Sequence, residues 1–147
     1  MKLKVKHFND LTAKELFEIY KLRVSVFVVE QQCPYQEVDE LDRAAWHVWL
    51  EDEDGIEAYA RVQSAGSAFE DVGIGRVIAV KRCCGLGTEI VKAAIETAKN
   101  KLGAESITLE AQVYARALYE KLGFAAVSDE FDEDGIPHIR MRLDGLK

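Results

Sequence analysis

The segment from residue 72 to residue 103 constrains the fold more than any other part of this sequence. It begins with an almost continuous apolar run, 72–80, which has the length and composition of a central, buried strand. Two glycines follow, and apolar residues then recur every three or four positions until Gly103, as in an amphipathic helix that ends at a glycine. A second strand-like run, 106–111, comes next. The segment therefore predicts a β-α-β crossover between two parallel strands.

The rest of the chain places further elements on both sides of this crossover. The periodicity predicts a strand at 2–8, a helix from Thr12 to Phe27, a loop at 31–44, a hairpin of 46–51 with 57–63, a helix at 114–122, and strands at 124–127 and 136–143 around an acidic turn, 129–135. Thr12 and Glu15 have the spacing of a capping box. With no linker or repeat in the sequence, we expect an α/β fold with a mixed sheet in one domain, 1–147.

Charge and composition narrow the classes of function. The chain has 26 acidic and 19 basic residues and a formal net charge of −7, whereas nucleic-acid-binding proteins usually carry the opposite balance. No apolar run reaches the length of a membrane span and no signal peptide opens the chain, so we expect a cytoplasmic protein with neither nucleic acid nor membrane as partner. The cysteines, Cys33, Cys83 and Cys84, suit neither a disulfide framework nor a metal site, and we expect reduced thiols and no metal.

One turn joins the buried strand to the long helix, with the sequence Val80-Lys81-Arg82-Cys83-Cys84-Gly85-Leu86-Gly87. The first N–H groups of a helix have no partner within it and carry partial positive charge. Because glycines remove side chains that would keep a ligand away, such a turn can hold a pyrophosphate. By spacing alone a plain tight turn is the more ordinary interpretation.

A second segment favours the functional interpretation. Residues 107–124 read Ile-Thr-Leu-Glu-Ala-Gln-Val-Tyr-Ala-Arg-Ala-Leu-Tyr-Glu-Lys-Leu-Gly-Phe. An Arg-x-x-Gly-x-Gly turn at 82–87, followed by a strand and Ala-x-x-x-Tyr-Glu-Lys-Leu-Gly-Phe, resembles the GNAT N-acetyltransferases. Residues 23–39 and 134–139 are similar to the ElaA-like branch of that superfamily, so the resemblance spans nearly the whole chain.

The resemblance implies a GNAT-like acyl-CoA N-acyltransferase fold, with a mostly antiparallel sheet splayed between its central strands and flanked by helices. It implies acetyl-CoA as the acyl donor and an unidentified primary amine, on a small molecule or a peptide, as the acceptor. It also implies a set of cofactor-binding residues: Ile78, Ala79, Val80, Arg82, Cys83, Cys84, Gly85, Leu86, Gly87, Thr88 and Gln112. Tyr119 stands where relatives carry the general acid that protonates the departing CoA thiolate.

Direct attack of an amine on a thioester needs an oxyanion donor and a base. A strand N–H such as that of Val80 can stabilise the oxyanion. Glu110 is a candidate base, with a solvated strand residue as the equal alternative. Glu30, His47 and His138 are candidate substrate contacts, although a histidine is more often structural. The acidic residues of 37–42 could attract a cationic acceptor, but a solvated loop is the more ordinary interpretation.

Two other functions stay open. Because Cys83 and Cys84 fill positions that are often Gly, Lys or Arg in relatives, a non-catalytic, CoA-binding regulatory module is the main alternative. Five residues are faintly similar to the acyl-homoserine-lactone synthases, which share the fold: Arg23, Phe27, Glu37, Asp39 and Asp42. The chain is short for that class. The oligomeric state is open, with a homodimer through the C-terminal edge strand as one alternative.

Overall fold

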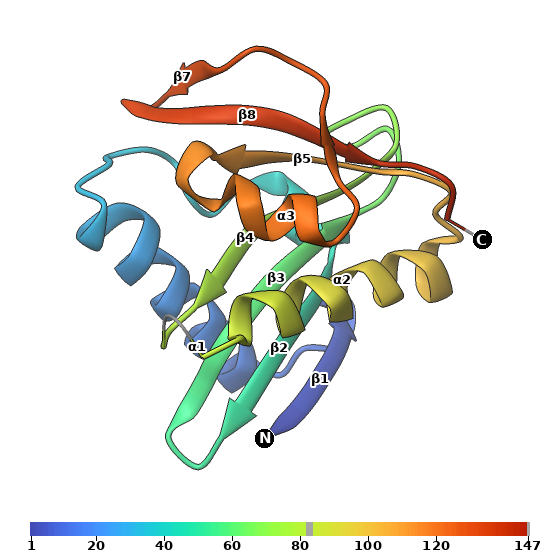
Figure 1. The fold of residues 1–147 in the computed structure, drawn as a ribbon. Helices are drawn as coiled ribbons and strands as arrows, with labels where there is room; N and C mark the ends of the chain where they lie inside the picture. Colours follow the sequence, from blue (N-terminus) through green and yellow to red (C-terminus); the bar gives the residue numbers. More distant parts are fainter. Residues whose placement is uncertain (82–83, 147) are drawn as a thin grey trace.

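The computed structural model describes residues 1–81 and 84–146, and within them eight strands form one mixed sheet (Figure 1). The strands are β1 (Lys2–His7), β2 (Trp46–Asp52), β3 (Gly55–Gln63), β4 (Val72–Ala79), β5 (Ile107–Gln112), β6 (Ala125–Ala126), β7 (Phe131–Glu133) and β8 (Ile136–Leu143). Their order is β1-β2-β3-β4-β5-β8-β6, and β7 pairs with β8. Neighbouring strands are antiparallel except β4 and β5, which are parallel. The predicted crossover is thereby confirmed.

The helices are α1 (Ala13–Val24), α2 (Leu86–Leu102) and α3 (Arg116–Lys121). Short 3₁₀ turns lie at η1 (Phe8–Asp10), η3 (Glu40–Ala44) and η4 (Val113–Ala115), and η2 (Ser25–Glu30) is a π-helix. Among these described helices, none combines the length and apolar character that crossing a bilayer requires. The Thr12–Glu15 capping box is present at the start of α1.

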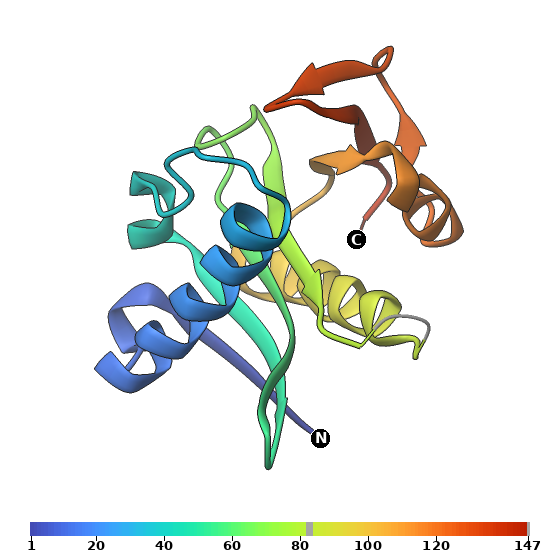
Figure 2. The same cartoon turned by 90° about the vertical axis from the view of Figure 1, so that its left-hand side faces the viewer.

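Strand β3 separates the two layers of the core because its side chains alternate between the faces of the sheet. Ala58, Ala60 and Val62 are fully buried in the cluster that packs against α2. Tyr59 points to the other face and packs in a second cluster with Ile19 of α1. Figure 2 shows α1 and α2 on opposite sides of the central strands. Helix α2 thus covers one face and leaves the other to α1.

The sheet opens between β4 and β5. These strands pair only at Val72–Ile107 and Gly73–Thr108, and beyond this point they separate. The halves on either side stay intact, since β4 pairs with β3 and β5 pairs with β8 along six positions, from Ile107–Leu143 to Gln112–His138. The splayed sheet expected from the resemblance is therefore confirmed, and the V-shaped opening is visible in Figure 2.

Three local features differ from the sequence expectation. The helix predicted to run to Phe27 is α-helical only to Val24 and continues as the π-helix, where the N–H of Gln31 bonds the carbonyl of Val26. The acidic turn at 129–135 contains strand β7, so only Asp134 and Gly135 form the tight turn. Strand β4 is irregular at Arg76, which has a φ of +55° where the β3 register shifts. Both π-helices and bulges occur often beside functional sites.

Candidate active site

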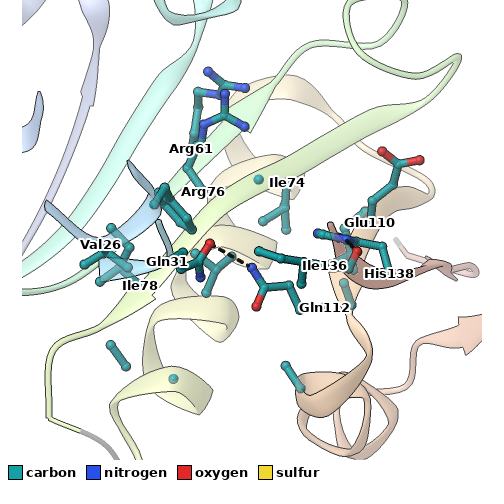
Figure 3. Close-up of a pocket in the computed structure, with 18 of the residues that line it drawn as sticks. Val26, Gln31, Arg61, Ile74, Arg76, Ile78, Glu110, Gln112, Ile136 and His138 are labelled. Atoms are coloured by element: carbon teal, nitrogen blue, oxygen red, sulfur yellow. Dashed lines mark hydrogen bonds between the residues drawn. The ribbon is translucent and has the colours of Figure 1, made fainter. Parts of the chain in front are cut away.

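A cavity of about 880 Å³ lies in the opening between β4 and β5 (Figure 3). Its walls come from segments far apart in the chain: the end of η2, strands β3 and β4, the start of α2, strand β5, helix α3 and the β7–β8 hairpin. Most of the site residues predicted from the sequence meet here: Glu30, Ile78, Ala79, Val80, Gly85, Leu86, Gly87, Thr88, Glu110, Gln112, Tyr119 and His138. We call this cavity the cleft.

One end of the cleft is formed by main chain and small residues. Residues 78–80 lie along the open edge of β4, and 85–88 form the first turn of α2. Gly85 caps α2 with a φ of +76°, a left-handed conformation that glycine adopts most readily. A Cβ at Gly87 would lie 3.0 Å from Cδ1 of Leu118, so a larger residue there would push against α3. This end presents helix N–H groups with room for an anion.

Three predicted cofactor residues in this turn are not assigned to the cleft. Arg82 and Cys83 lie outside the described residues. Cys84 is exposed and is not among the residues that line the cleft. Among the residues predicted for this turn, those of 85–88 therefore line this end of the cleft.

The N–H of Val80 does not point into the cleft. It donates a 2.9 Å hydrogen bond to the carbonyl of Glu57 in β3, so the expected oxyanion donor is already engaged. Successive N–H groups of a strand point to opposite edges, and that of Ala79 therefore points to the open edge of β4. Ala79 replaces Val80 as the candidate oxyanion donor.

Tyr119 lies on α3 beside the cleft and is 7% exposed. Its ring packs edge-on against Phe124 at a centroid distance of 5.8 Å, which fixes its position. Within the described part of the chain its hydroxyl has no hydrogen-bond partner. Burial, together with the neighbouring phenol of Tyr114, raises the pKa of Tyr119 above its usual range. The group therefore stays protonated at neutral pH and can donate a hydrogen bond into the cleft.

Polar side chains from β5 and β8 form the opposite wall. Glu110 binds Arg140, with 2.9 Å between Oε2 and Nη2, and the Glu110 side chain remains 24% exposed. His138 donates from Nδ1 to the carbonyl of Ile136 at 2.7 Å, and its Nε2 lies 3.7 Å from Oε2 of Glu133. Gln112 reaches across the opening and donates to Oε1 of Gln31 at 3.4 Å (Figure 3). Glu110 thus keeps Oε1 for a substrate, whereas Nε2 of His138 already faces the carboxylate of Glu133.

His47, predicted as a substrate contact, lies outside the cleft. It is fully buried, with Nδ1 2.6 Å from the Tyr59 hydroxyl and Nε2 3.1 Å from the carbonyl oxygen of Asp42. Since a carbonyl only accepts, Nε2 carries the proton and the Tyr59 hydroxyl donates to Nδ1. Burial lowers the pKa of His47 to about 4. His47 is therefore a neutral, structural residue, and the prediction that it contacts substrate was wrong.

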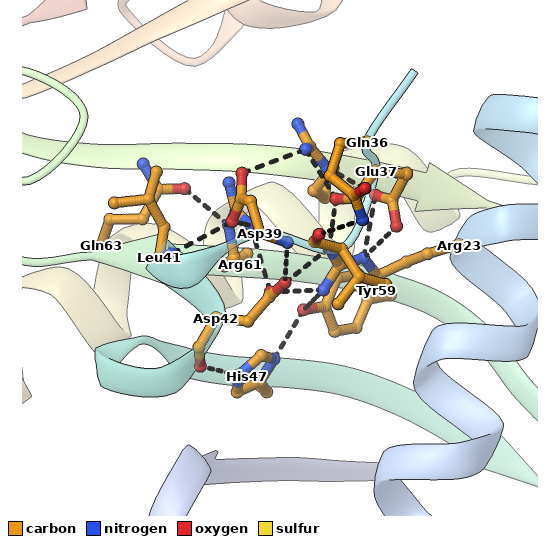
Figure 4. Close-up of polar contacts among 12 residues, drawn as sticks. Arg23, Gln36, Glu37, Asp39, Leu41, Asp42, His47, Tyr59, Arg61 and Gln63 are labelled. Carbon is orange, nitrogen blue, oxygen red and sulfur yellow. Dashed lines mark hydrogen bonds and ion pairs between the residues drawn. The ribbon is translucent and has the colours of Figure 1, made fainter. Parts of the chain in front are cut away.

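His47 belongs to a buried ionic network that also corrects the view of 37–42 as a solvated loop (Figure 4). Arg23 donates to both carboxylate oxygens of Asp42, at 2.6 and 3.1 Å, and to Glu37. Arg61 contacts Asp42 and Asp39. Burial alone would raise the pKa of Asp42, but hydrogen bonds and charge from Arg23 hold it below its usual value. The carboxylates of Glu37, Asp39 and Asp42 are paired with arginines, so they do not form a subsite that could bind a cationic acceptor.

Arg61, Gln63 and Arg76 line the cleft but were not predicted from the sequence. They lie near its vertex, which is the point where β4 and β5 still pair, at Val72 and Gly73. Arg76 packs over the ring of Tyr35 and binds both Glu37 and Asp39. A signal was available, because Arg76 is the one charged residue in the apolar run 72–80, and Arg61 and Gln63 interrupt the buried strand 57–63. Among the described residues, no group of three or more His, Cys, Asp or Glu is arranged to hold a metal ion.

Comparison with known proteins agrees with this geometry. A family model described as an acetyltransferase (GNAT) domain matches residues 10–144. A UPF0039 protein of Schizosaccharomyces pombe is 43% identical over 143 residues, which cover 95% of this chain and 94% of the relative. The crystal structure of an acyl-CoA N-acyltransferase from Pseudomonas aeruginosa is 39% identical with a TM-score of 0.89, covering 97% of this chain and 99% of that one.

The crystal structure of Escherichia coli ElaA is 33% identical with a TM-score of 0.90, and again covers 97% of this chain and 99% of that one. The identity extends along nearly the full length of both proteins, and the fold has the splayed sheet with the helix N-terminus at its opening. This chain belongs to the GNAT acetyltransferase family, with ElaA and the UPF0039 proteins as relatives, and is an acyltransferase with the fold that uses acyl-CoA as cosubstrate.

Proposed function

We propose that the protein transfers an acetyl group from acetyl-CoA to a primary amine by direct attack. The observation that carries this proposal is the Tyr119 hydroxyl, which is buried, protonated and without a hydrogen-bond partner among the described residues. It lines the same cleft as the open edge of β4 and the first turn of α2. An unpartnered hydroxyl beside a thioester site is what protonation of a departing thiolate requires.

The cleft fits the parts of acyl-CoA. Residues 85–88 expose the N-terminus of a 17-residue helix, where N–H groups and the helix dipole favour the pyrophosphate. Residues 78–80 offer an unpaired strand edge to the pantetheine arm, which carries amides of its own. Between these segments and α3 lies the position for the thioester.

The chain's own residues account for each step of the transfer. The amine attacks the thioester carbonyl carbon, and the N–H of Ala79 stabilises the negative charge on its oxygen. The C–S bond breaks and Tyr119 donates its proton to the sulfur. Glu110 takes the proton from the amine, directly or through water, since only one of its oxygens is bound to Arg140. No covalent enzyme intermediate is needed, so Cys83 and Cys84 need not be nucleophiles.

Isothermal titration with acetyl-CoA, then CoA, tests the cofactor end. We expect micromolar binding that is lost in Gly87→Glu, because the new carboxylate crowds Leu118 and repels phosphate. Tyr119→Phe then tests the chemistry. It should lower kcat by about 10²-fold or more while the dissociation constant of acetyl-CoA stays the same.

Tyr20→Phe is the matched control, since Tyr20 lies on α1 outside the cleft, and it should leave kcat unchanged. Unaltered kcat in Tyr119→Phe would contradict the acid role. Tight CoA binding with no transfer to any amine would contradict the reaction and favour a CoA-binding regulatory module.

A further inference from the structure

The vertex of the cleft carries a set of N–H donors that acetyl transfer itself does not use. Arg61, Gln63 and Arg76 line this region, and Figure 3 shows Arg61 and Arg76 across the cleft from Glu110 of β5. The strand register places them there, because Gln63 pairs with Gly73, the last position of β4 that pairs with β5, and Arg61 pairs with Gly75, two residues beyond it.

Each of these side chains is held by hydrogen bonds of its other polar atoms and keeps one nitrogen without a partner among the described residues. Arg61 uses Nε on Gln63 Oε1 at 2.9 Å and Nη1 on Asp39 and Asp42. Arg76 uses Nε on Glu37 and Nη2 on the Glu37 carbonyl and Asp39. Within residues 1–81 and 84–146, Arg61 Nη2, Arg76 Nη1 and Gln63 Nε2 have no hydrogen-bond partner.

These three nitrogens keep access to solvent, and the residues that carry them line the cleft. Among the described residues, Glu57 Oε2 is the one side-chain nitrogen or oxygen that is both fully shielded and unpartnered, so the three nitrogens retain access to solvent. The Arg61 side chain is only 3% exposed and that of Arg76 20%, and both line the cleft. Donors fixed in advance and open on one side form a binding site for an anion.

The close packing around Gln63 holds its side-chain amide in one position. A Cβ at Gly73 would lie 2.8 Å from Gln63 Nε2, and a Cβ at Gly75 would lie 3.2 Å from Gln63 Oε1. The absence of a side chain at both glycines therefore lets the Gln63 amide pack closely against β4, where Arg61 Nε binds its Oε1.

Charge decides which kind of ligand fits. The cations Arg23, Arg61 and Arg76 are balanced by the anions Glu37, Asp39 and Asp42 in one network. A multiply charged anion would leave this neutral network with an excess of negative charge, in a protein whose net charge is −7. A ligand with one carboxylate and one ammonium adds no net charge, and Glu110 across the cleft suits the ammonium.

We propose that the acetyl acceptor is an amino acid, whose carboxylate binds Arg61 Nη2, Arg76 Nη1 and Gln63 Nε2 and whose amine faces Glu110. This inference rests on the proposed acetyl transfer to an amine and names the class of acceptor. Peptides with a free N-terminus lack a carboxylate beside the amine and are excluded as preferred acceptors.

The test compares acceptors that differ only in the carboxylate. Leucine is paired with 3-methylbutylamine, phenylalanine with phenethylamine and lysine with 1,5-diaminopentane, with acetyl-CoA as donor and the product measured by mass spectrometry. For at least one pair we expect kcat/KM to be about tenfold or more higher for the amino acid than for the amine. Only the amino acid has a carboxylate that can accept charge-assisted hydrogen bonds from the three nitrogens, and a factor of about ten is typical of such a contact. Equal or higher values for the amines in every pair would overturn the proposal.

Gln63→Glu sharpens the test, because it keeps an oxygen for Arg61 Nε and replaces the open N–H₂ by a carboxylate. We expect KM for the amino acid to rise about tenfold or more, with KM for its paired amine unchanged or lower. Asn100→Asp is the matched control: it makes the same change of charge on the exposed part of α2, outside the cleft, and should change neither KM. Equal effects of Gln63→Glu on both acceptors would contradict the subsite.

A binding measurement separates this inference from the proposed function. Titration of N-acetyl-leucine and of N-(3-methylbutyl)acetamide into the protein with CoA requires no turnover. Tighter binding of the acid, lost in Gln63→Glu, supports the subsite even if no acceptor is acetylated, whereas equal or absent binding of both overturns it. Failure of transfer in all pairs counts against the proposed function alone.

Discussion

The two ends of the cleft differ in which part of the chain supplies their polar groups. At the α2 end the functional groups belong to the main chain, presented by a glycine cap and by a strand edge without a partner. At the vertex they are charged side chains, fixed by partners from the helix α1, the loop before η3 and the strands β3 and β4. A main-chain site depends on backbone shape, whereas a side-chain site depends on every partner being present.

This difference has an energetic side. The ionic network holds three cations and three anions, most of them almost fully buried, and taking such charges out of water is costly unless every group is paired. The same network joins the polar segment 31–44 to the sheet through Glu37 and Asp42. We therefore expect substitutions at the vertex to lower the free energy of unfolding strongly, and substitutions at the α2 end to change it little.

Arg23→Met should have the largest effect on stability. Arg23 is 0% exposed and is the common partner of Glu37 and Asp42, so its removal leaves two buried carboxylates short of a cation. We expect the free energy of unfolding to fall by about 3–5 kcal/mol, measured by urea denaturation.

Arg43→Met is the control for this comparison. The Arg43–Glu40 pair spans 3.4 Å, but its side chains are 72% and 87% exposed, so its loss should change the unfolding midpoint little. If Arg23→Met were no more harmful than Arg43→Met, the network would not be the element that fixes the vertex.

His47→Gln should have the next largest effect, and the part that depends on pH should appear only in acid. The pKa of His47 is lowered by burial to about 4, against about 6.5 in the unfolded chain. Between these values the unfolded state binds a proton that the folded state does not, so stability is complete above pH 6.5 and falls as the pH drops toward 4.

The slope from this one group is about 1.4 kcal/mol per pH unit across that window. Urea titrations at pH 7.0, 6.0, 5.0 and 4.5 should show a shallower decline in His47→Gln than in the unaltered protein. Parallel declines would mean that His47 is not the group responsible.

The α2 end could be predicted from the sequence because its signals are local. A strand, two glycines and a helix within residues 72–103 define the backbone of the site, and Tyr119 lies in a short motif of its own. Even there, the choice of Val80 as oxyanion donor was wrong. Strand register decides which N–H points outward, and the partner of Val80, Glu57, lies 23 residues away in the sequence and carries no sign of the pairing.

The vertex could not be predicted because its partners also lie far apart in the sequence, and it has more of them. Arg23 meets Glu37 and Asp42 across 14 and 19 positions, and Arg76 meets Glu37 across 39. Residues 37–42 read as a solvated loop because acidic residues usually are solvated, and only the fold brings them to buried arginines. The lone charge in the run 72–80 and the polar residues Arg61 and Gln63 in the strand 57–63 were the signs that a polar site borders the central strands.

Gly85→Ala should have the smallest effect, and it tests whether backbone shape alone governs the α2 end. Gly85 has a φ of +76°, and a Cβ there would meet nothing within 4 Å, so the cost is that of a left-handed residue, about 1 kcal/mol. Gly87→Ala makes the converse change, because Gly87 is helical and its Cβ would lie 3.0 Å from the movable end of Leu118. The helix gains about 0.5–1 kcal/mol from alanine, which offsets that contact. In urea denaturation Gly85→Ala should therefore be less stable than Gly87→Ala, and the reverse order would show that packing against α3, rather than the conformation of the cap, sets the stability of this end of the cleft.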